Sequence, residues 1–208
     1  MNIVSLFNGR VRRMDLYEDS DLKNARKEYD KGVDGLRIHR EINNRSFLNE
    51  FLKYFGDIDS LSISAYGDGV SYNFLYQMSN LKNLNLHCMY EIDFINLKKL
   101  ENLSIWWSKK LIHNFDSLIK LEHLSITEFD EKDLTKLSSL TNLKSLSFRT
   151  AKIKSLKGIE TLTNLKSISF GGVRSLIDIS DISALKNLKF LEFDICWKLE
   201  DFSPIEQL

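Results

Sequence analysis

The chain has 208 residues, 43% of them hydrophobic, and carries 29 basic and 29 acidic side chains. This length suffices to bury a continuous core in one folded array. The balanced charge provides no general attraction to nucleic acid or to anionic lipid, so we expect neither as a partner.

The composition also bears on the compartment. The first residues, 1–7, lack the basic region and the long apolar region of a secretory signal. No apolar run approaches the roughly 18 residues that a membrane helix needs. The two cysteines, Cys88 and Cys196, do not form a disulfide framework. We therefore expect a cytoplasmic protein without a membrane segment.

Residues 1–32 are predicted to form an N-terminal cap. The pair Asn8-Gly9 separates the apolar runs 3–7 and 11–16, a pattern typical of a β-hairpin. Residues 21–29 are then expected to form a short helix. Residues 33–208 form the second predicted region, a repeat array of eight strands and a terminal half-repeat.

A six-residue pattern recurs through this second region. Leu81-Lys-Asn-Leu84-Asn-Leu86 has apolar residues at its first, fourth and sixth positions, and we call the fourth position the marker. The markers are Leu36, Leu61, Leu84, Leu103, Leu124, Leu146, Ile168 and Leu191. Their spacing of 19 to 25 residues is the period of a solenoid with one supersecondary unit per repeat.

The apolar spacing within each repeat predicts its secondary structure. Apolar residues alternate around each marker, which indicates a strand with one buried face. Between later strands they recur every third residue, as in Ile153, Leu156 and Ile159, a spacing suited to 3₁₀ turns. Residues 47–55 instead have helical spacing, and Gly56 is expected to end that helix.

The eight repeats resemble those of bacterial leucine-rich-repeat proteins of the internalin type. The resemblance implies an α/β leucine-rich-repeat solenoid, with a curved parallel sheet on its concave face and short helices, turns and loops on its convex face. That family usually has asparagine five residues after the marker. Here these positions are Glu41, Tyr66, Met89, Ser108, Phe129, Ala151, Val173 and Cys196. The chain thus lacks the usual asparagine ladder, and we expect apolar packing in its place.

The last residues form an incomplete repeat. Leu199, Phe202, Ile205 and Leu208 have the three-residue spacing of a convex segment, but no strand follows them. The strand near residues 190–195 is therefore expected to have an unpaired edge, which could support a homodimer or a partner strand.

No catalytic motif is present, since the chain has no phosphate-binding loop, no HExxH, no CxxC and no GxSxG. Gly67-Asp68-Gly69 is interpreted as a plain turn, and His39 and His87 fall two coils apart, too far to share a metal. We expect no enzyme activity, no cofactor and no metal.

The residues one before, one after and three after each marker are predicted to point out of the concave face. Serine and asparagine dominate these positions, so the larger and charged side chains stand out as candidates for partner binding. We expect Trp106 to be the central anchor, because tryptophan and arginine are the commonest hot-spot residues. The predicted partner-binding residues are Trp106, Trp107, His87, Arg149, Arg37, His39, His123, Asp194 and Glu192.

These features favour a non-enzymatic scaffold that binds a protein partner. The most specific hypothesis is an intracellular bacterial immunity-type protein that neutralises a toxin. Two alternatives stay open: a self-assembling or adaptor protein that uses the C-terminal edge, and the recognition domain of a larger effector system.

Overall fold

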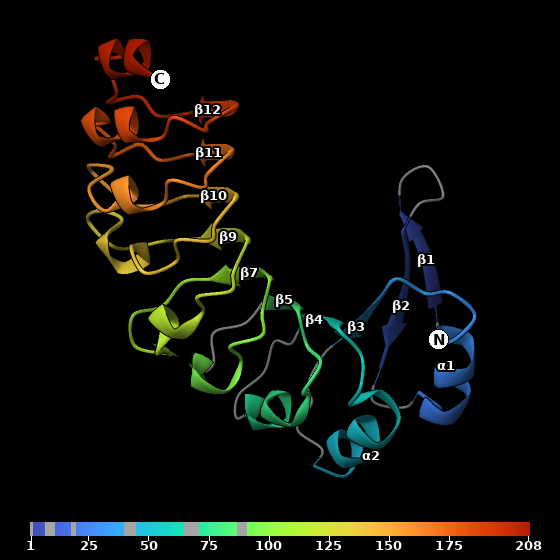
Figure 1. Ribbon diagram of the computed structural model, residues 1–208. Helices are drawn as coiled ribbons and strands as arrows, with labels where there is room; N and C mark the ends of the chain where they lie inside the picture. The colour runs from blue at the N-terminus through green and yellow to red at the C-terminus, as the bar shows by residue number, and fades with distance from the viewer. Residues whose placement is uncertain (1, 7–10, 18–19, 40–44, 65–70, 87–90) are drawn as a thin grey trace. The chain divides into compact units, whose positions relative to one another are not determined.

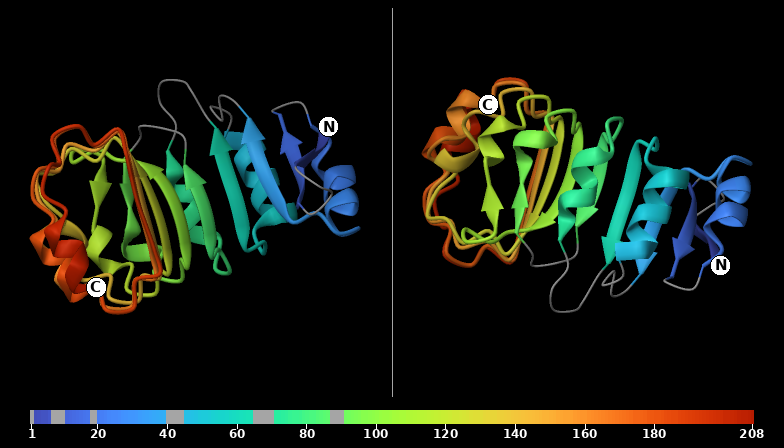
Figure 2. Two further views of the ribbon diagram at one scale, coloured as in Figure 1. Left: turned by 90° about the horizontal axis from the view of Figure 1, so that it is seen from above. Right: turned by 90° about the horizontal axis from the view of Figure 1, so that it is seen from below.

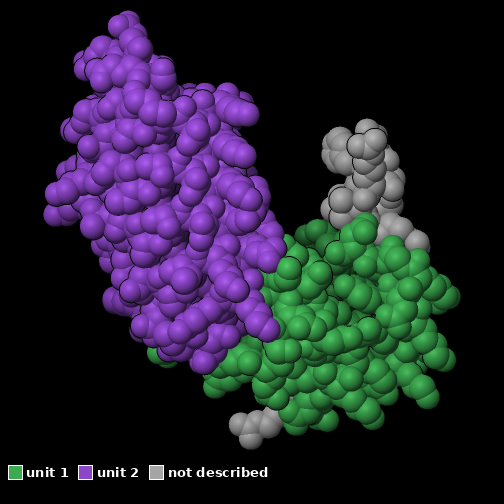
Figure 3. All heavy atoms as spheres, viewed as in Figure 1, with its two compact units in different colours: residues 1–92 green, residues 93–208 purple. Residues whose placement is uncertain are grey.

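The computed structural model describes residues 2–6, 11–17, 20–39, 45–64, 71–86 and 91–208 (Figure 1). By their contacts the residues divide into two compact units, residues 1–92 (unit 1) and residues 93–208 (unit 2), shown in Figure 3. This division falls inside the repeat array. The cap boundary expected after residue 32 therefore stays a prediction.

Unit 1 contains the strands in the order β1-β2-β3-β4-β5. Their bounds are β1 Asn2–Leu6, β2 Val11–Leu16, β3 Gly35–His39, β4 Ser60–Ser64 and β5 Asn83–Leu86. β1 and β2 pair antiparallel, as in the expected hairpin, while its turn residues Asn8-Gly9 lie outside the described residues. β2 also pairs in parallel with β3, with Met14 opposite the marker Leu36. The sequence analysis missed this additional parallel strand.

Unit 2 contains five parallel strands in the order β7-β9-β10-β11-β12. Their bounds are β7 Asn102–Trp106, β9 His123–Thr127, β10 Ser145–Arg149, β11 Ser167–Gly171 and β12 Phe190–Asp194. Each marker lies opposite the next, from Leu103 to Leu191. The eight predicted strands are all present, and the leucine-rich-repeat solenoid is confirmed.

Two helices and a series of short 3₁₀ segments connect the strands. Helix α1 (Leu22–Tyr29) begins at Asp21, whose carboxylate accepts from the N–H of Asn24, and α2 spans Arg45–Phe55. The 3₁₀ segments are η1 Tyr72–Gln77, η2 Phe94–Asn96, η3 Phe115–Ser117, η4 Thr135–Leu137, η5 Ile159–Thr161, η6 Ser180–Ala184 and η7 Ser203–Gln207. Of these segments, η5, η6 and η7 lie in the stretches where the three-residue apolar spacing predicted turns of the convex side.

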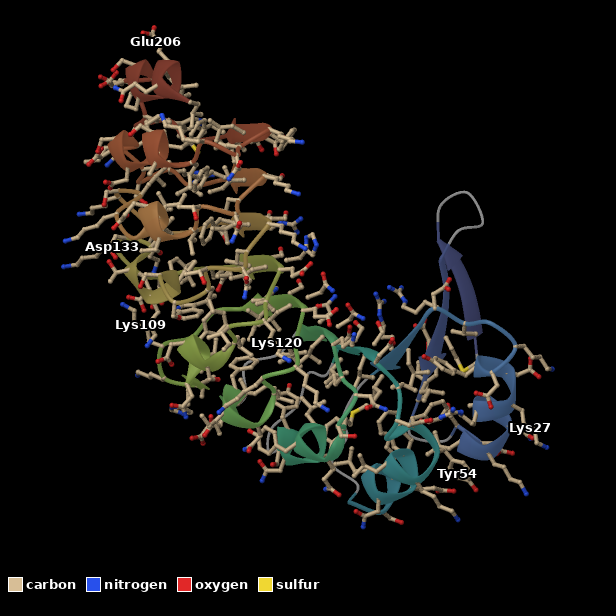
Figure 4. All side chains as sticks on the ribbon, viewed as in Figure 1. Lys27, Tyr54, Lys109, Lys120, Asp133 and Glu206 are labelled. Atoms are coloured by element: carbon tan, nitrogen blue, oxygen red, sulfur yellow. The ribbon has the colours of Figure 1, made fainter. Side chains whose placement is uncertain are left out.

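Aspartates start several of these turns. The carboxylates of Asp133 and Asp178 accept from the N–H groups of Thr135 and Ser180, and these bonds hold the pKa of both carboxyls below the ordinary value. Asp133 lies on the side of unit 2 that carries the 3₁₀ segments, as Figure 4 shows. A small two-stranded sheet, β6 (Ile92–Asp93) with β8 (Ile112–His113), accompanies them.

The core of unit 2 lies between the sheet and the 3₁₀ segments. Seen along the stack in Figure 2, the yellow to red coils lie over one another. The rings of Phe129, Phe148, Phe170 and Phe193 follow one another with centroids 5.2 to 5.7 Å apart. Equivalent residues of successive coils thus pack as continuous rows.

A sharp turn follows most strands of unit 2. Glu128, Thr150, Gly172 and Ile195, each four residues after its marker, have φ between 54° and 68°. The three residues that come directly after Glu128, Thr150 and Gly172 are at most 5% exposed. The predicted apolar packing of the loop is therefore present in these coils.

Asparagine residues instead link neighbouring coils by hydrogen bonds from another position of the repeat, four residues before the marker. The side-chain amides of Asn142, Asn164 and Asn187 donate to carbonyl oxygens of the preceding coil at 2.7 to 2.9 Å. In unit 1, Asn80 donates to the carbonyl of Asp57 at 3.2 Å. We call the three in unit 2 the asparagine row. These asparagines lie outside the usual family position, five residues after the marker, and this row was not predicted.

In the described part of the chain, no helix has the length and apolarity needed to cross a membrane.

Candidate protein-binding surface

The outer face of the unit 2 sheet has a floor of small polar side chains. Ser104, Ser125, Ser147 and Ser169 lie opposite one another on neighbouring strands, and all four are half-buried. Each lies one residue after a buried marker, because side chains alternate along a strand. The row ends at Glu192, whose carboxylate accepts from the hydroxyl of Ser169 at 2.6 Å. This serine row leaves space above the middle of the sheet.

Larger side chains border the serine row two residues further along each strand. Trp106 lies opposite Thr127 in the register and is half-buried, whereas Arg149 and Asp194 are exposed. Gly171 separates Arg149 from Asp194 and presents no side chain there. The face therefore combines one indole ring, a cation and an anion over a floor of small residues.

A third row lies on the other side of the serines. It includes His123, which is exposed, and Phe190, whose side chain on the last strand is 51% exposed. Of the residues predicted for partner binding, unit 2 thus brings five to one sheet face. These five are Trp106, His123, Arg149, Glu192 and Asp194.

Trp107 does not belong to this surface. Its side chain is 7% exposed, and its ring packs edge-on against Phe115 and Phe129 at 5.1 and 4.8 Å. The prediction that Trp107 contacts a partner placed it on the exposed end of the strand. The structure corrects that placement, because the chain turns inward one residue earlier here than in the following coils.

The remaining predicted residues belong to unit 1. Arg37 is half-buried on the outer face of β3, opposite Asp15 and Ser62. His39 ends β3, but its side chain lies outside the described part of the structure, as does all of His87.

The sequence analysis missed Arg13 and Asp15 on β2, which share this face. Their nearest charged atoms are 3.6 Å apart, and Asp15 is 6% exposed. Burial, and then the charge of Arg37, lower the pKa of the Arg13 guanidinium, while Asp15 opposes that shift. The alternation of Arg13 and Asp15 with the apolar Met14 and Leu16 is the sequence pattern that could have revealed them.

A shallow cleft lies next to the helices of unit 1. Its volume is about 560 Å³, and Arg26, Tyr54, Asp57 and Asn80 are among its lining residues; Tyr54 is labelled in Figure 4. Arg26 donates to both carboxylate oxygens of Asp57 and to the carbonyl of Tyr54. Because its main charges already pair with each other, this cleft holds the helices together and offers little to a charged ligand.

The potential metal-binding side chains and the described cysteine bear on whether the chain can hold a reactive centre. Three or more His, Cys, Asp or Glu side chains do not come together as a metal site among the described residues. Burial raises the pKa of the half-buried Cys196 thiol, which disfavours its thiolate form. The turn interpreted at Gly67-Asp68-Gly69 lies outside the described residues.

Comparisons with known proteins are consistent with this architecture. No family model and no curated protein sequence matches the chain. Among solved structures, an internalin (inlF) from Listeria monocytogenes is 18% identical with a TM-score of 0.53, and the match covers 85% of this chain and 57% of that one. The functional domain of InlJ from Listeria monocytogenes is 16% identical with a TM-score of 0.54, covering 82% of this chain and 36% of that one.

This chain therefore spans less than two thirds of either neighbour, and identities this low establish a shared fold alone. The parallel strands in register, the 3₁₀ connections and these neighbours agree with one another. The chain is a leucine-rich-repeat protein with the fold of the bacterial internalins.

Proposed function

We propose that this protein is a non-enzymatic scaffold that binds another protein through the outer face of its sheet. The observation that carries the proposal is the position of Trp106, half-buried on the sheet face and bordered by the small side chains of Thr127 and the serine row. A tryptophan that rises from such a floor can insert into a pocket of a partner and lose its remaining contact with water. The exposed charges of Arg149 and Asp194 can then set the orientation of the partner.

The more specific role that we propose is that of a cytoplasmic bacterial immunity-type protein whose partner is a toxin. A preformed sheet face can cover a folded enzyme without any change in its own backbone, which suits inhibition by blocking. The small size and the repeat architecture of the chain suggest this immunity role. A measurement of the partner's toxic activity tests the role directly.

Affinity capture on the immobilised chain, compared between variants, tests the binding face. A genuine partner is retained by the wild type and lost with Trp106→Ala, for which we expect affinity to fall by about 2 kcal/mol or more. Lys136→Ala, an exposed change on η4 away from the sheet, is the control. Equal retention by Trp106→Ala and the control would contradict the proposed face.

The toxin hypothesis has its own test. The captured partner is expressed alone and together with this chain, and growth is followed. Arrest by the partner alone, with rescue by the wild type but weaker rescue by Trp106→Ala, is expected. A partner that does not impair growth would leave the scaffold function standing and remove the immunity role. In that case the chain would serve as an adaptor or as the recognition part of a larger effector system.

A second candidate function is assembly through the edge of β12, the last strand in the order of the described sheet. Large apolar side chains lie on or just after this strand, since Phe190 is 51%, Ile195 42% and Trp197 72% exposed. Exposed edges of this kind accept another strand. Light scattering of the pure protein tests for a homodimer.

Charges placed beside the edge separate this candidate from binding by the face. Ile195→Lys and Trp197→Lys change exposed side chains just after β12 and leave the sheet face intact, whereas Lys198→Ala in the exposed turn is the control. A monomer whose Ile195→Lys and Trp197→Lys variants bind the partner normally would rule out the edge.

A further inference from the structure

The outer face of the unit 1 sheet carries a row of polar residues that differs from the serine row of unit 2. Asp15, Arg37, Ser62 and Asn85 lie opposite one another on β2, β3, β4 and β5. Arg13 lies on the same face of β2, opposite Gly35. We call these five side chains the arginine row. They come from four strands that the repeat holds in fixed register.

Several atoms of the arginine row lack hydrogen-bond partners. Arg13 Nε, Arg37 Nε, Ser62 Oγ and Asn85 Oδ1 are buried from solvent, and none has a partner among the described residues. Buried polar atoms in folded proteins are nearly always hydrogen-bonded, so a group of four on neighbouring strands calls for an explanation. The missing hydrogen bonds are informative because the four atoms all lie in one row of one sheet face.

The charges of the row are also unbalanced. Two guanidinium groups face one carboxylate, and Arg13 Nε lies 3.6 Å from Asp15 Oδ1. Within the described part of the chain, Arg37 makes no ion pair. The two arginines repel each other across the pair of strands, and the half-buried setting weakens screening by water. Among the described residues of this face, the charge of Arg37 therefore has no opposite charge paired with it.

We propose that the arginine row recognises an acidic side chain, aspartate or glutamate, of a protein partner. The proposal deepens the function argued above and rests on it, since it assigns the chemistry of one contact to the sheet face. A carboxylate has only acceptor atoms, and its planar shape matches the guanidinium fork in a two-bond contact. It supplies a second negative charge on this face and acceptors for the Nη groups of the two guanidinium forks, whereas the buried Asn85 Oδ1, itself an acceptor, stays outside the contact.

The row also has room for such a group. Gly35 lies opposite Arg13 in the register, and among the described residues the atom nearest to the position of a Cβ there is Ser60 Oγ, at 3.6 Å. The side chain of Arg13 stays 20% exposed and that of Asp15 only 8%. An incoming carboxylate therefore meets the guanidinium before it meets the carboxylate of Asp15.

A purely structural role for Arg37 makes a different prediction about stability. If Arg37 stabilised the fold by pairing with Asp15, Arg37→Gln would lower the denaturation midpoint. If Arg37 is instead reserved for a partner, its removal relieves repulsion with Arg13, and the midpoint stays the same or rises. A clear fall in the midpoint of Arg37→Gln would overturn the proposal.

The direct test uses the full chain with labelled arginine side chains and follows the Nε–Hε resonances by NMR. The probe is the blocked peptide acetyl-Gly-Glu-Gly-amide, and the glutamine peptide of the same length is its control. We expect saturable shifts at Arg13 and Arg37 with the glutamate peptide and at least 10-fold weaker binding of the glutamine peptide. Equal binding of both peptides, or no saturable shift, would show that the row does not select carboxylates.

Variants and a competing anion complete the experiment. Arg37→Gln should abolish the saturable shift at Arg13, and Arg37→Lys should weaken it several-fold because lysine lacks the planar fork. Arg174→Gln, at an exposed turn of unit 2 outside the sheet, is the matched control and should change nothing. Tighter binding of inorganic phosphate than of the glutamate peptide would overturn the assignment to an acidic protein side chain. Because the peptide needs no natural partner, this result is independent of the capture experiment on Trp106.

Discussion

The indole ring of Trp107 packs against the ring of Phe129 in the following coil, with centroids 4.8 Å apart and planes at 64°. The neighbouring residue Trp106 lies on the outer face of the sheet. Two adjacent tryptophans thus have opposite environments, one within the aromatic core of unit 2 and one on the proposed binding face. Substituting each separately distinguishes stability from binding.

Trp107→Ala is expected to destabilise the fold by about 3–5 kcal/mol, because it leaves a cavity between Phe115 and Phe129. Trp106→Ala should cost less than about 1 kcal/mol, as for a surface change without a packed cavity. Urea denaturation of both variants measures the difference. Equal losses would mean that Trp106 is a structural residue and would weaken the proposed face.

Successive side chains of a strand lie on opposite faces of the sheet. This alternation predicts different changes in stability for substitutions at two neighbouring residues. Leu124 is 2% exposed, so Leu124→Ala should destabilise by about 2–5 kcal/mol. Ser125 is half-buried on the outer face, and Ser125→Ala should change stability by at most about 0.5 kcal/mol. Thermal and denaturant melts compare them directly, and a larger loss with Ser125→Ala would reverse the assignment of faces.

The asparagine row predicts that substitution of an exposed asparagine lowers the free energy of unfolding. The Asn164 side chain donates to the carbonyl of Thr141 at 2.9 Å. Asn164→Ala should lose about 1 kcal/mol, and Asn164→Asp at least as much, because a carboxylate oxygen would face that carbonyl. Thr163→Ala is the control, since it keeps the carbonyl that accepts from Asn187. If the control costs as much as Asn164→Ala, the row has no role in stability.

The turns after the strands predict a substitution that stabilises. Thr150 has φ of 57°, a left-handed conformation that costs a residue with a side chain about 1–2 kcal/mol. Thr150→Gly removes this strain at an exposed position and should raise the free energy of unfolding by about 1 kcal/mol. Thr141→Gly, at an exposed site without positive φ, should lower it instead. Denaturation midpoints that fall in both variants would show that Thr150 is not strained.

The contact of Arg26 with Asp57 predicts a pH dependence. The hydrogen bond from Arg26 lowers the pKa of the Asp57 carboxyl below its ordinary value of 3.8. A carboxyl with a lowered pKa in the folded state stabilises the fold above the pKa of the unfolded chain. That stabilisation is lost as the pH falls through the lowered value. Asp57→Asn should therefore be less stable than the wild type at pH 6, and the difference should shrink toward pH 2.

A double substitution shows whether Arg26 causes this effect. In the Arg26→Gln background, Asp57→Asn should have little further influence on the pH profile, because the two changes remove the same interaction. An undiminished effect of Asp57→Asn in that background would assign the pH dependence to another group.

Much of the fold followed from the spacing of apolar residues along the chain. Alternation around each marker identified the strands, because a strand places successive side chains on opposite faces and only one face is buried. The three-residue spacing identified the 3₁₀ segments of the later coils, and the period fixed which residues lie opposite one another. The sequence pattern alone thus assigns Ser125 and Arg149 to the outer face.

The packing between coils determines the placement of residues that the local sequence pattern could not assign to the core or to the surface. Trp107 keeps a negative φ, whereas the equivalent Thr150 takes the left-handed conformation, and this difference turns Trp107 into the core. The backbone dihedrals of such turns depend on the coil stacked alongside, so residues beyond the end of a strand cannot be placed from their own spacing. The arginine row arises in the same way, because Arg13 and Arg37 are 24 positions apart in the sequence and meet only when β2 pairs in parallel with β3.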